Sequence, residues 1–232
     1  MLQDYKIHVQ ERLEQGIPPL PLNAEQVSGL VELLKSPPPS EEKYILDMIT
    51  NRTPAGVDPA AYIKAAFLTD VAKGNTSCPL IDRKHATKLL GTMLGGYNVE
   101  SLVNLLTDDE VGSLAADGLC NTLLMFNAKH DVIELAKENE NAKRVIESWS
   151  EAEWFTSKPE LPEMIKAIVF RVDGEINTDD LSPAPDAPSR PDIPLHALAM
   201  LKKTMQDPIT AIDKLKESGL PVVFVGDVVG TG

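Results

Sequence analysis

Apolar residues in the first two thirds of the chain recur at helical spacing. In the segment from Asn23 to Lys35 they stand at i, i+3, i+4 and i+7, as on one face of a helix. Asn23 and Gln26 have the spacing of a capping box, which predicts that this helix begins directly after Asn23. Further boundaries are predicted from capping and breaking residues: starts at Ser40, Asp58-Pro59 and Asp82, an end at Gly74, and a last helix over 142–154.

Two helices of similar length follow one another between Asn98 and Phe126, separated by the polar turn 107–109. A helix–turn–helix unit of about 30 residues is typical of a HEAT-type repeat. The earlier segments 23–52 and 58–91 share this plan with weak similarity. An irregular helical bundle remains the alternative interpretation of the same pattern.

The periodicity changes near Lys158. A strand is predicted over 165–172, helices over 195–205 and 209–218, and a buried strand over 222–225. A strand, helices and a second strand favour a parallel pair with a crossover. The sequence therefore predicts an α + α/β fold, with an all-helical domain over residues 1–157 and an α/β domain over residues 158–232.

The last seven residues, GDVVGTG, follow the second predicted strand. Glycines after a core strand are expected to form a tight turn at its carboxyl end, where α/β sheets bind ligands. Because two strands cannot form a stable sheet of their own, we expect this domain to continue beyond Gly232.

Composition narrows the classes of function. The 232 residues carry a net charge of −13, which argues against a broad nucleic-acid footprint and against docking on an anionic membrane. The two cysteines, Cys78 and Cys120, are expected to be buried, reduced thiols of a cytosolic protein, too few for an iron–sulfur cluster. The four histidines lack metal-ligand spacing, so we expect structural roles for them: His8, His85, His130 and His196.

The polar, proline-rich stretch from Gly174 to Asp192 is the candidate site. It contains Asp179 and, eleven positions later, Arg190, whose guanidinium could hold a carboxylate through two parallel hydrogen bonds. Four prolines lower the entropy cost of keeping such a loop ordered. The alternative is that 177–179 only cap a turn and that Arg190 is a surface ion-pair residue.

Four strings carry a family resemblance: GEINTDDLSPAPDAPSRPDIPLHALAML (174–201), LLGTMLGGYN (89–98), EAEWF (151–155) and VGDVVGTG (225–232). Through them the whole chain resembles the N-terminal part of the bacterial aconitase B family. The resemblance implies a HEAT-like domain followed by the start of a swivel domain, with domains that carry a [4Fe–4S] cluster farther along. It implies that this fragment binds no cluster itself.

The resemblance assigns substrate-site roles to two residues. Arg190 matches the arginine that grips a substrate carboxylate, and Asp179 matches the acidic residue of a Thr-Asp turn that orients a partner in the active site. Aconitases often have histidine at the next position, where this chain has Asp180, so no role is carried onto Asp180. The catalytic serine and the cluster cysteines would lie after Gly232, so the fragment alone is expected to be inactive.

The implied activity is a cytoplasmic hydro-lyase of the citric acid cycle. It would interconvert citrate and isocitrate through cis-aconitate and would also dehydrate 2-methylisocitrate. The alternative function is an interaction module, in which the helical domain mediates homodimerisation and the cluster-free protein binds messenger RNA in an iron-dependent manner. A scaffold without a ligand is the third possibility.

Overall fold

The computed structural model describes residues 1–15, 19–54, 56–93, 96–122, 127–158, 160, 162–189 and 193–231. Its contacts divide the chain into two units. We call Met1 with Leu22–Pro159 the helical unit, and Leu2–Pro21 with Glu160–Gly232 the mixed unit. Within the described residues, no helix is both long enough and apolar enough to cross a membrane.

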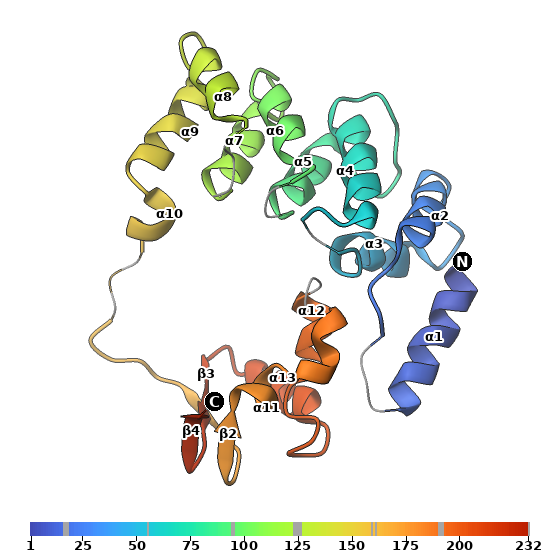
Figure 1. The fold of residues 1–232 in the computed structure, drawn as a ribbon, viewed down its shortest axis with the longest axis vertical. Coiled ribbons are helices and arrows are strands. Elements are labelled where there is room, and N and C mark those ends of the chain that lie inside the picture. Colours follow the sequence, from blue (N-terminus) through green and yellow to red (C-terminus); the bar gives the residue numbers. More distant parts are fainter. Residues whose placement is uncertain are drawn as a thin grey trace. The chain divides into compact units, whose positions relative to one another are not determined.

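The helical unit consists of successive helix pairs (Figure 1). The pairs are α2 (Ala24–Lys35) with α3 (Glu42–Asn51), α4 (Pro59–Ala72) with α5 (Arg83–Gly91), α6 (Val99–Leu105) with α7 (Gly112–Cys120), and α8 (Lys129–Leu135) with α9 (Glu140–Ser150). A short α10 (Glu153–Thr156) follows. Neighbouring pairs pack through the contacts α2–α4, α5–α7 and α7–α9, so each pair covers an apolar face of the next.

Several predicted helix ends are confirmed. Asn23 and Gln26 form the predicted capping box, and the carboxylates of Asp58 and Asp82 cap α4 and α5. Two predictions are wrong. Helix α3 begins at Glu42 without a side-chain cap, because Ser40 has φ 68° in the left-handed region. The helix predicted over 142–154 is divided, because Ala152 has φ 51° between α9 and α10.

Side chains of one helix satisfy the carbonyl groups that end another, which would otherwise lack partners. The bonds are Lys64 Nζ to Thr50 O (3.3 Å), Arg83 Nε to Ala72 O (2.8 Å), Asn98 Nδ2 to Leu90 O (2.7 Å), Asn141 Nδ2 to Leu106 O (2.9 Å) and Trp149 Nε1 to Leu119 O (3.0 Å). These bonds fix the helices in register, since each joins a particular turn of one helix to the end of another.

Arg83 joins three segments of the helical unit. Besides its bond to the end of α4, its guanidinium pairs with Glu110 at 2.6 Å and with Asp108 in the turn between α6 and α7. Burial raises the pKa of Asp108, but hydrogen bonds from Arg83 and from two backbone N–H groups outweigh it and lower that pKa. This pairing therefore stabilises the fold above about pH 4 and is lost as the pH falls through the lowered pKa.

The described residues of the mixed unit form two pairs of parallel strands. Its elements are α1 (Leu2–Glu14), β1 (Ile168–Arg171), β2 (Glu175–Asn177), α11 (Thr178–Leu181), a 3-10 helix (Ala184–Ser189), α12 (Ile193–Ala197), α13 (Pro208–Lys216), β3 (Val222–Val225) and β4 (Val228–Thr231). Strand β1 pairs with β3, which confirms the predicted parallel pair. Strand β2 pairs with β4, and these two strands lie side by side in Figure 1. Strands β2 and β4 were not predicted.

One face of the β1–β3 pair forms the core of the mixed unit. Phe170 packs edge-on against Phe224 with ring centroids 5.3 Å apart, and Ile212 of α13 is buried in the same cluster. Met200 and Met205 pack against this cluster. Strand β3 is not buried on both faces as predicted: its residues alternate between half-buried and exposed.

The prediction of one helix over 195–205 is wrong. Helix α12 ends at Ala197, and turns follow as far as α13. Leu201 lies in the left-handed region with φ 58° and is almost fully buried in the core cluster. A bulky residue in that conformation costs roughly 1–2 kcal/mol, so its surroundings must hold it in place.

Helices α5 and α7 approach most closely at two glycines. A Cβ atom at Gly118 would lie 2.9 Å from the Cα of Gly91 and 3.2 Å from a methyl carbon of Leu102. Such distances cannot be relieved by rotating a side chain alone, because one of the atoms is backbone. The two helices can therefore pack at this spacing only if this position has no side chain.

We predict that Gly118→Ala lowers the free energy of unfolding of the 232-residue chain by about 1–3 kcal/mol, because α5 and α7 must move apart. Urea denaturation measures the change. The matched control is Gly29→Ala in α2, whose added Cβ would meet only the side chain of Met1 at 3.4 Å. The control should gain up to about 1 kcal/mol from helix propensity. Equal effects of the two substitutions would contradict the packing argument.

Candidate functional site

The candidate site is the loop that joins β2 to α12 in the mixed unit. Asp179 lies in the first turn of α11, and its side chain is exposed. Within the described part of the chain it makes no side-chain hydrogen bond or ion pair, so its carboxylate is available to a ligand. Arg190 lies outside the described residues, in the segment 190–192 between the 3-10 helix and α12.

Asn177 caps α11, as the alternative interpretation of this stretch predicted. Its side chain accepts a hydrogen bond from the backbone N–H of Asp180 at 3.1 Å. The carboxylate of Asp180 in turn accepts from the backbone N–H of Asn177 at 2.9 Å, which completes a capping box. This reciprocal pair sets the direction in which the turn leaves β2.

Asp180 also bonds to the segment that follows α12. Its second carboxylate oxygen, Oδ1, accepts from the hydroxyl of Thr204 at 3.0 Å. Its backbone carbonyl accepts from the N–H of Leu201 at 2.6 Å. The turn that carries Asp179 is thereby connected to the core cluster, because the side chain of Leu201 is buried there.

Two more polar contacts hold the rest of the loop. The hydroxyl of Ser182 lies 2.9 Å from Nε2 of His196 in α12. Farther along, the carboxylate of Asp186 forms an ion pair with Nζ of Lys202 at 2.6 Å, and the two side chains are only 3% and 16% exposed. Polar side chains therefore hold the loop at Ser182 and at Asp186.

A hydrogen bond joins the break between β1 and β2 to the break between β3 and β4. The carboxylate of Asp227, between β3 and β4, accepts from the N–H of Gly174, between β1 and β2, at 2.9 Å. Arg171 lies between the carboxylates of Asp173 and Asp227. The tight turn predicted after β3 is wrong: the chain only bends at Asp227 before β4 begins. Gly226 is closely packed, since a Cβ there would lie 2.8 Å from a carbon of Ile176.

Sequence reasoning missed the residues that fix the loop. Asp180, Ser182 and Asp186 were regarded only as polar loop residues. The spacing of Asn177 and Asp180 matches the N-cap and third helical positions, and it could have identified the capping box. The partners of the other two lie more than ten positions away, at His196 and Lys202, and no local pattern indicates them.

Comparison with known proteins gives the family. The model of the aconitate B N-terminal domain matches residues 4–155, and the model of the aconitate hydratase 2 N-terminus matches residues 167–232. The chain belongs to the aconitase B family. It corresponds to the N-terminal portion of aconitase B.

Three relatives are aligned over the full length of this chain. They are named aconitate hydratase B and come from Pseudomonas aeruginosa (57% identical), Synechocystis (56%) and Escherichia coli (53%). The chain covers 28%, 27% and 28% of their respective lengths. It therefore spans little more than a quarter of the aconitase B relatives that it matches.

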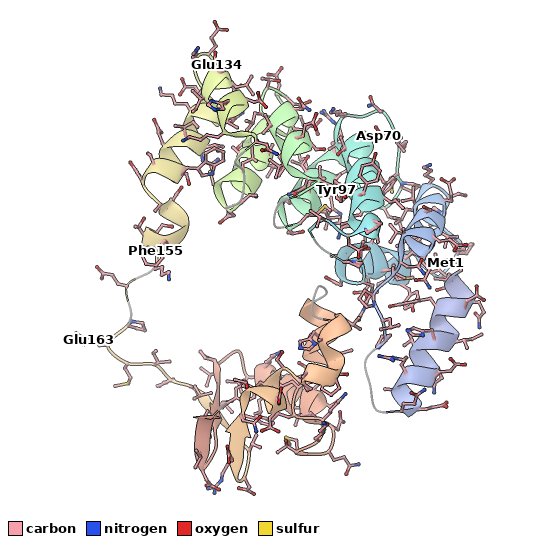
Figure 2. All side chains as sticks on the ribbon, in the orientation of Figure 1. Met1, Asp70, Tyr97, Glu134, Phe155 and Glu163 are labelled. Atoms are coloured by element: carbon pink, nitrogen blue, oxygen red, sulfur yellow. The ribbon has the colours of Figure 1, made fainter. Side chains whose placement is uncertain are left out.

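The helical unit of this aconitase B segment has a groove of about 1150 Å³ between α6 and the region of α8. Four carboxylates line it against a single lysine, and Figure 2 marks one of them, Glu134, on α8. The lysine, Lys137, already pairs with Glu134. The charge of this groove suits a basic or neutral surface better than a nucleic-acid backbone.

We predict that Lys202→Met destabilises the loop, because it removes the ion pair between Nζ of Lys202 and the buried carboxylate of Asp186. The free energy of unfolding of the 232-residue chain should fall by about 2–3 kcal/mol in urea denaturation. Lys203→Met is the matched control, since Lys203 is adjacent but exposed, and it should change stability by less than about 0.5 kcal/mol. Two equal effects would mean that the Asp186 ion pair does not fix the loop.

Proposed function

We propose that this chain forms the N-terminal part of an aconitate hydratase that interconverts citrate and isocitrate through cis-aconitate in the citric acid cycle. The observation that carries the proposal is the match of both family models, supported by 57% identity over the whole chain to a relative named aconitate hydratase B. Dehydration involving 2-methylisocitrate is part of the same proposal. The segment alone would be inactive, because it supplies only part of the substrate site.

We assign Arg190 and Asp179 to that substrate site. The guanidinium of Arg190 would hold one carboxylate of the tricarboxylate in two parallel hydrogen bonds, which fixes the orientation of the substrate. Asp179 would orient a neighbouring group of the site. Its exposure on α11 and its lack of a side-chain partner within the described residues support this role.

The residues of this chain do not fit a [4Fe–4S] cluster. A cluster requires three or four thiolates, and the chain has two cysteines. Cys120 is buried, as predicted, and burial raises the pKa of its thiol. Cys78 is half-buried, which corrects the prediction for that residue, and its Sγ donates to the carbonyl of Leu34. No group of three potential metal ligands occurs within the described residues. We therefore derive no step through the cluster.

We also propose that the helix pairs form a HEAT-like domain over residues 1–157, followed by the start of a swivel domain over 158–232. The two free thiols support a cytoplasmic location, because disulfides are rare in that compartment.

We predict that Arg190→Lys in the full-length protein lowers kcat/KM for citrate roughly ten- to hundredfold, because a lysine cannot form the paired hydrogen bonds of a guanidinium. Steady-state aconitase assays measure the effect. Arg171→Lys is the matched control, since Arg171 is an exposed arginine of the same unit whose partners are Asp173 and Asp227. If Arg190→Lys retains kcat/KM within twofold of the wild type, Arg190 does not hold the substrate.

A second function is suggested by the stacked helix pairs of the helical unit, which can present an extended surface to a partner. We propose that this unit mediates homodimerisation, linked to iron, and that the cluster-free full-length protein binds messenger RNA through another surface. Sedimentation of the full-length protein with and without ferrous iron should show a dimer in one condition. A monomer in both would contradict this function and leave the hydratase proposal unaffected.

A further inference from the structure

Asp180 connects the turn that carries Asp179 to two other segments of the mixed unit. Its two carboxylate oxygens and its carbonyl oxygen accept three hydrogen bonds, from the N–H of Asn177, the hydroxyl of Thr204 and the N–H of Leu201. Asn177 precedes α12 in the sequence, whereas Leu201 and Thr204 follow it. Asp180 thus connects the end of β2 with the turns that precede α13.

Helix α11 has only four residues, Thr178 to Leu181. A single helical turn is not stable on its own in water, because fixing its backbone yields very few hydrogen bonds. The turn must therefore be held by bonds to its surroundings. Asp180 supplies these bonds at the position next to Asp179, and Leu201 anchors them in the core cluster.

The conformation of Leu201 adds a second constraint. Its φ of 58° is unfavourable for a residue with a branched side chain. In this conformation the N–H of Leu201 donates a hydrogen bond to the carbonyl oxygen of Asp180. Unfavourable backbone conformations persist where surrounding contacts fix them, and they are concentrated at functional sites. The same residue also accepts from the N–H of Thr204 at 2.9 Å, so the two donors to Asp180 hold each other in place.

We propose that Asp180 is a positioning residue for Asp179. The three bonds of Asp180 fix the turn, and the turn fixes the direction in which the exposed carboxylate of Asp179 projects. This inference rests on the proposed hydratase function and on the role assigned there to Asp179. It gives Asp180 an indirect role, through geometry, without contact with the substrate.

Asp180→Asn and Thr204→Val in the full-length protein test the inference. The first replaces a carboxylate oxygen by an amide NH2 group, which cannot accept a hydrogen bond, and the second removes only the hydroxyl bond, so that at least one variant should fold. We expect kcat for citrate to fall roughly tenfold for Asp180→Asn and severalfold for Thr204→Val, with KM within twofold, because a small displacement of a site residue mainly affects the reaction step. Asp213→Asn and Thr210→Val, at exposed positions of α13, are the matched controls.

A double-substitution cycle separates positioning from general destabilisation. If Asp180 acts through Asp179, then Asp180→Asn should lower kcat by less than twofold in a protein that already carries Asp179→Asn. Amide hydrogen exchange of residues 178–181 should become faster in both Asp180→Asn and Thr204→Val.

The inference is overturned if Asp180→Asn leaves kcat within twofold of the wild type, even with faster exchange. It is also overturned if the effects of Asp179→Asn and Asp180→Asn multiply, since that indicates independent roles. A different result would show that the proposed hydratase function is wrong. The wild-type full-length protein would then not convert citrate at all, and both proposals would be overturned together.

Discussion

The loop after β2 is held by hydrogen bonds and an ion pair to the segment that follows it in the sequence. The arrangement of the candidate site depends on these contacts. Apolar packing contributes little to the order of residues 178–189, because Leu181 is their one large aliphatic side chain and it is 40% exposed. Asp180 binds Thr204 and Leu201, Ser182 contacts His196, and Asp186 pairs with Lys202. The partners come from the segment 193–204, so the loop and this segment must fold together.

The parallel strands provide the base for the loop. Gly174 lies between β1 and β2, and Gly226 and Asp227 lie between β3 and β4. The hydrogen bond from Gly174 to Asp227 joins these two breaks. The end of β2 then leads directly into the cap at Asn177 and the turn of α11. Site geometry therefore depends on pairing between segments about 50 residues apart, which explains why the loop alone would not keep its conformation.

Much of the fold could be predicted from local patterns. Capping residues such as Asn23 and Asp82 located helix starts, and apolar periodicity located β1, β3 and α13. Local patterns failed where distant contacts decide the conformation. The apolar spacing around Leu201 resembles a helix, but the bond to Asp180 holds Leu201 in a left-handed turn. Strand β4 was missed because its few residues form a strand only by pairing with β2. For the site, sequence resemblance identified Asp179 and Arg190, whereas Asp180 was identified only by its contacts.

The most direct test of this account is a crystal structure of the full-length protein with citrate or isocitrate bound. We predict that the guanidinium of Arg190 lies within hydrogen-bond distance of a substrate carboxylate, that Asp179 faces the same site, and that the bond between Asp180 and Thr204 is retained. A structure in which the Arg190 side chain points into solvent, far from both Asp179 and the substrate, would contradict the account.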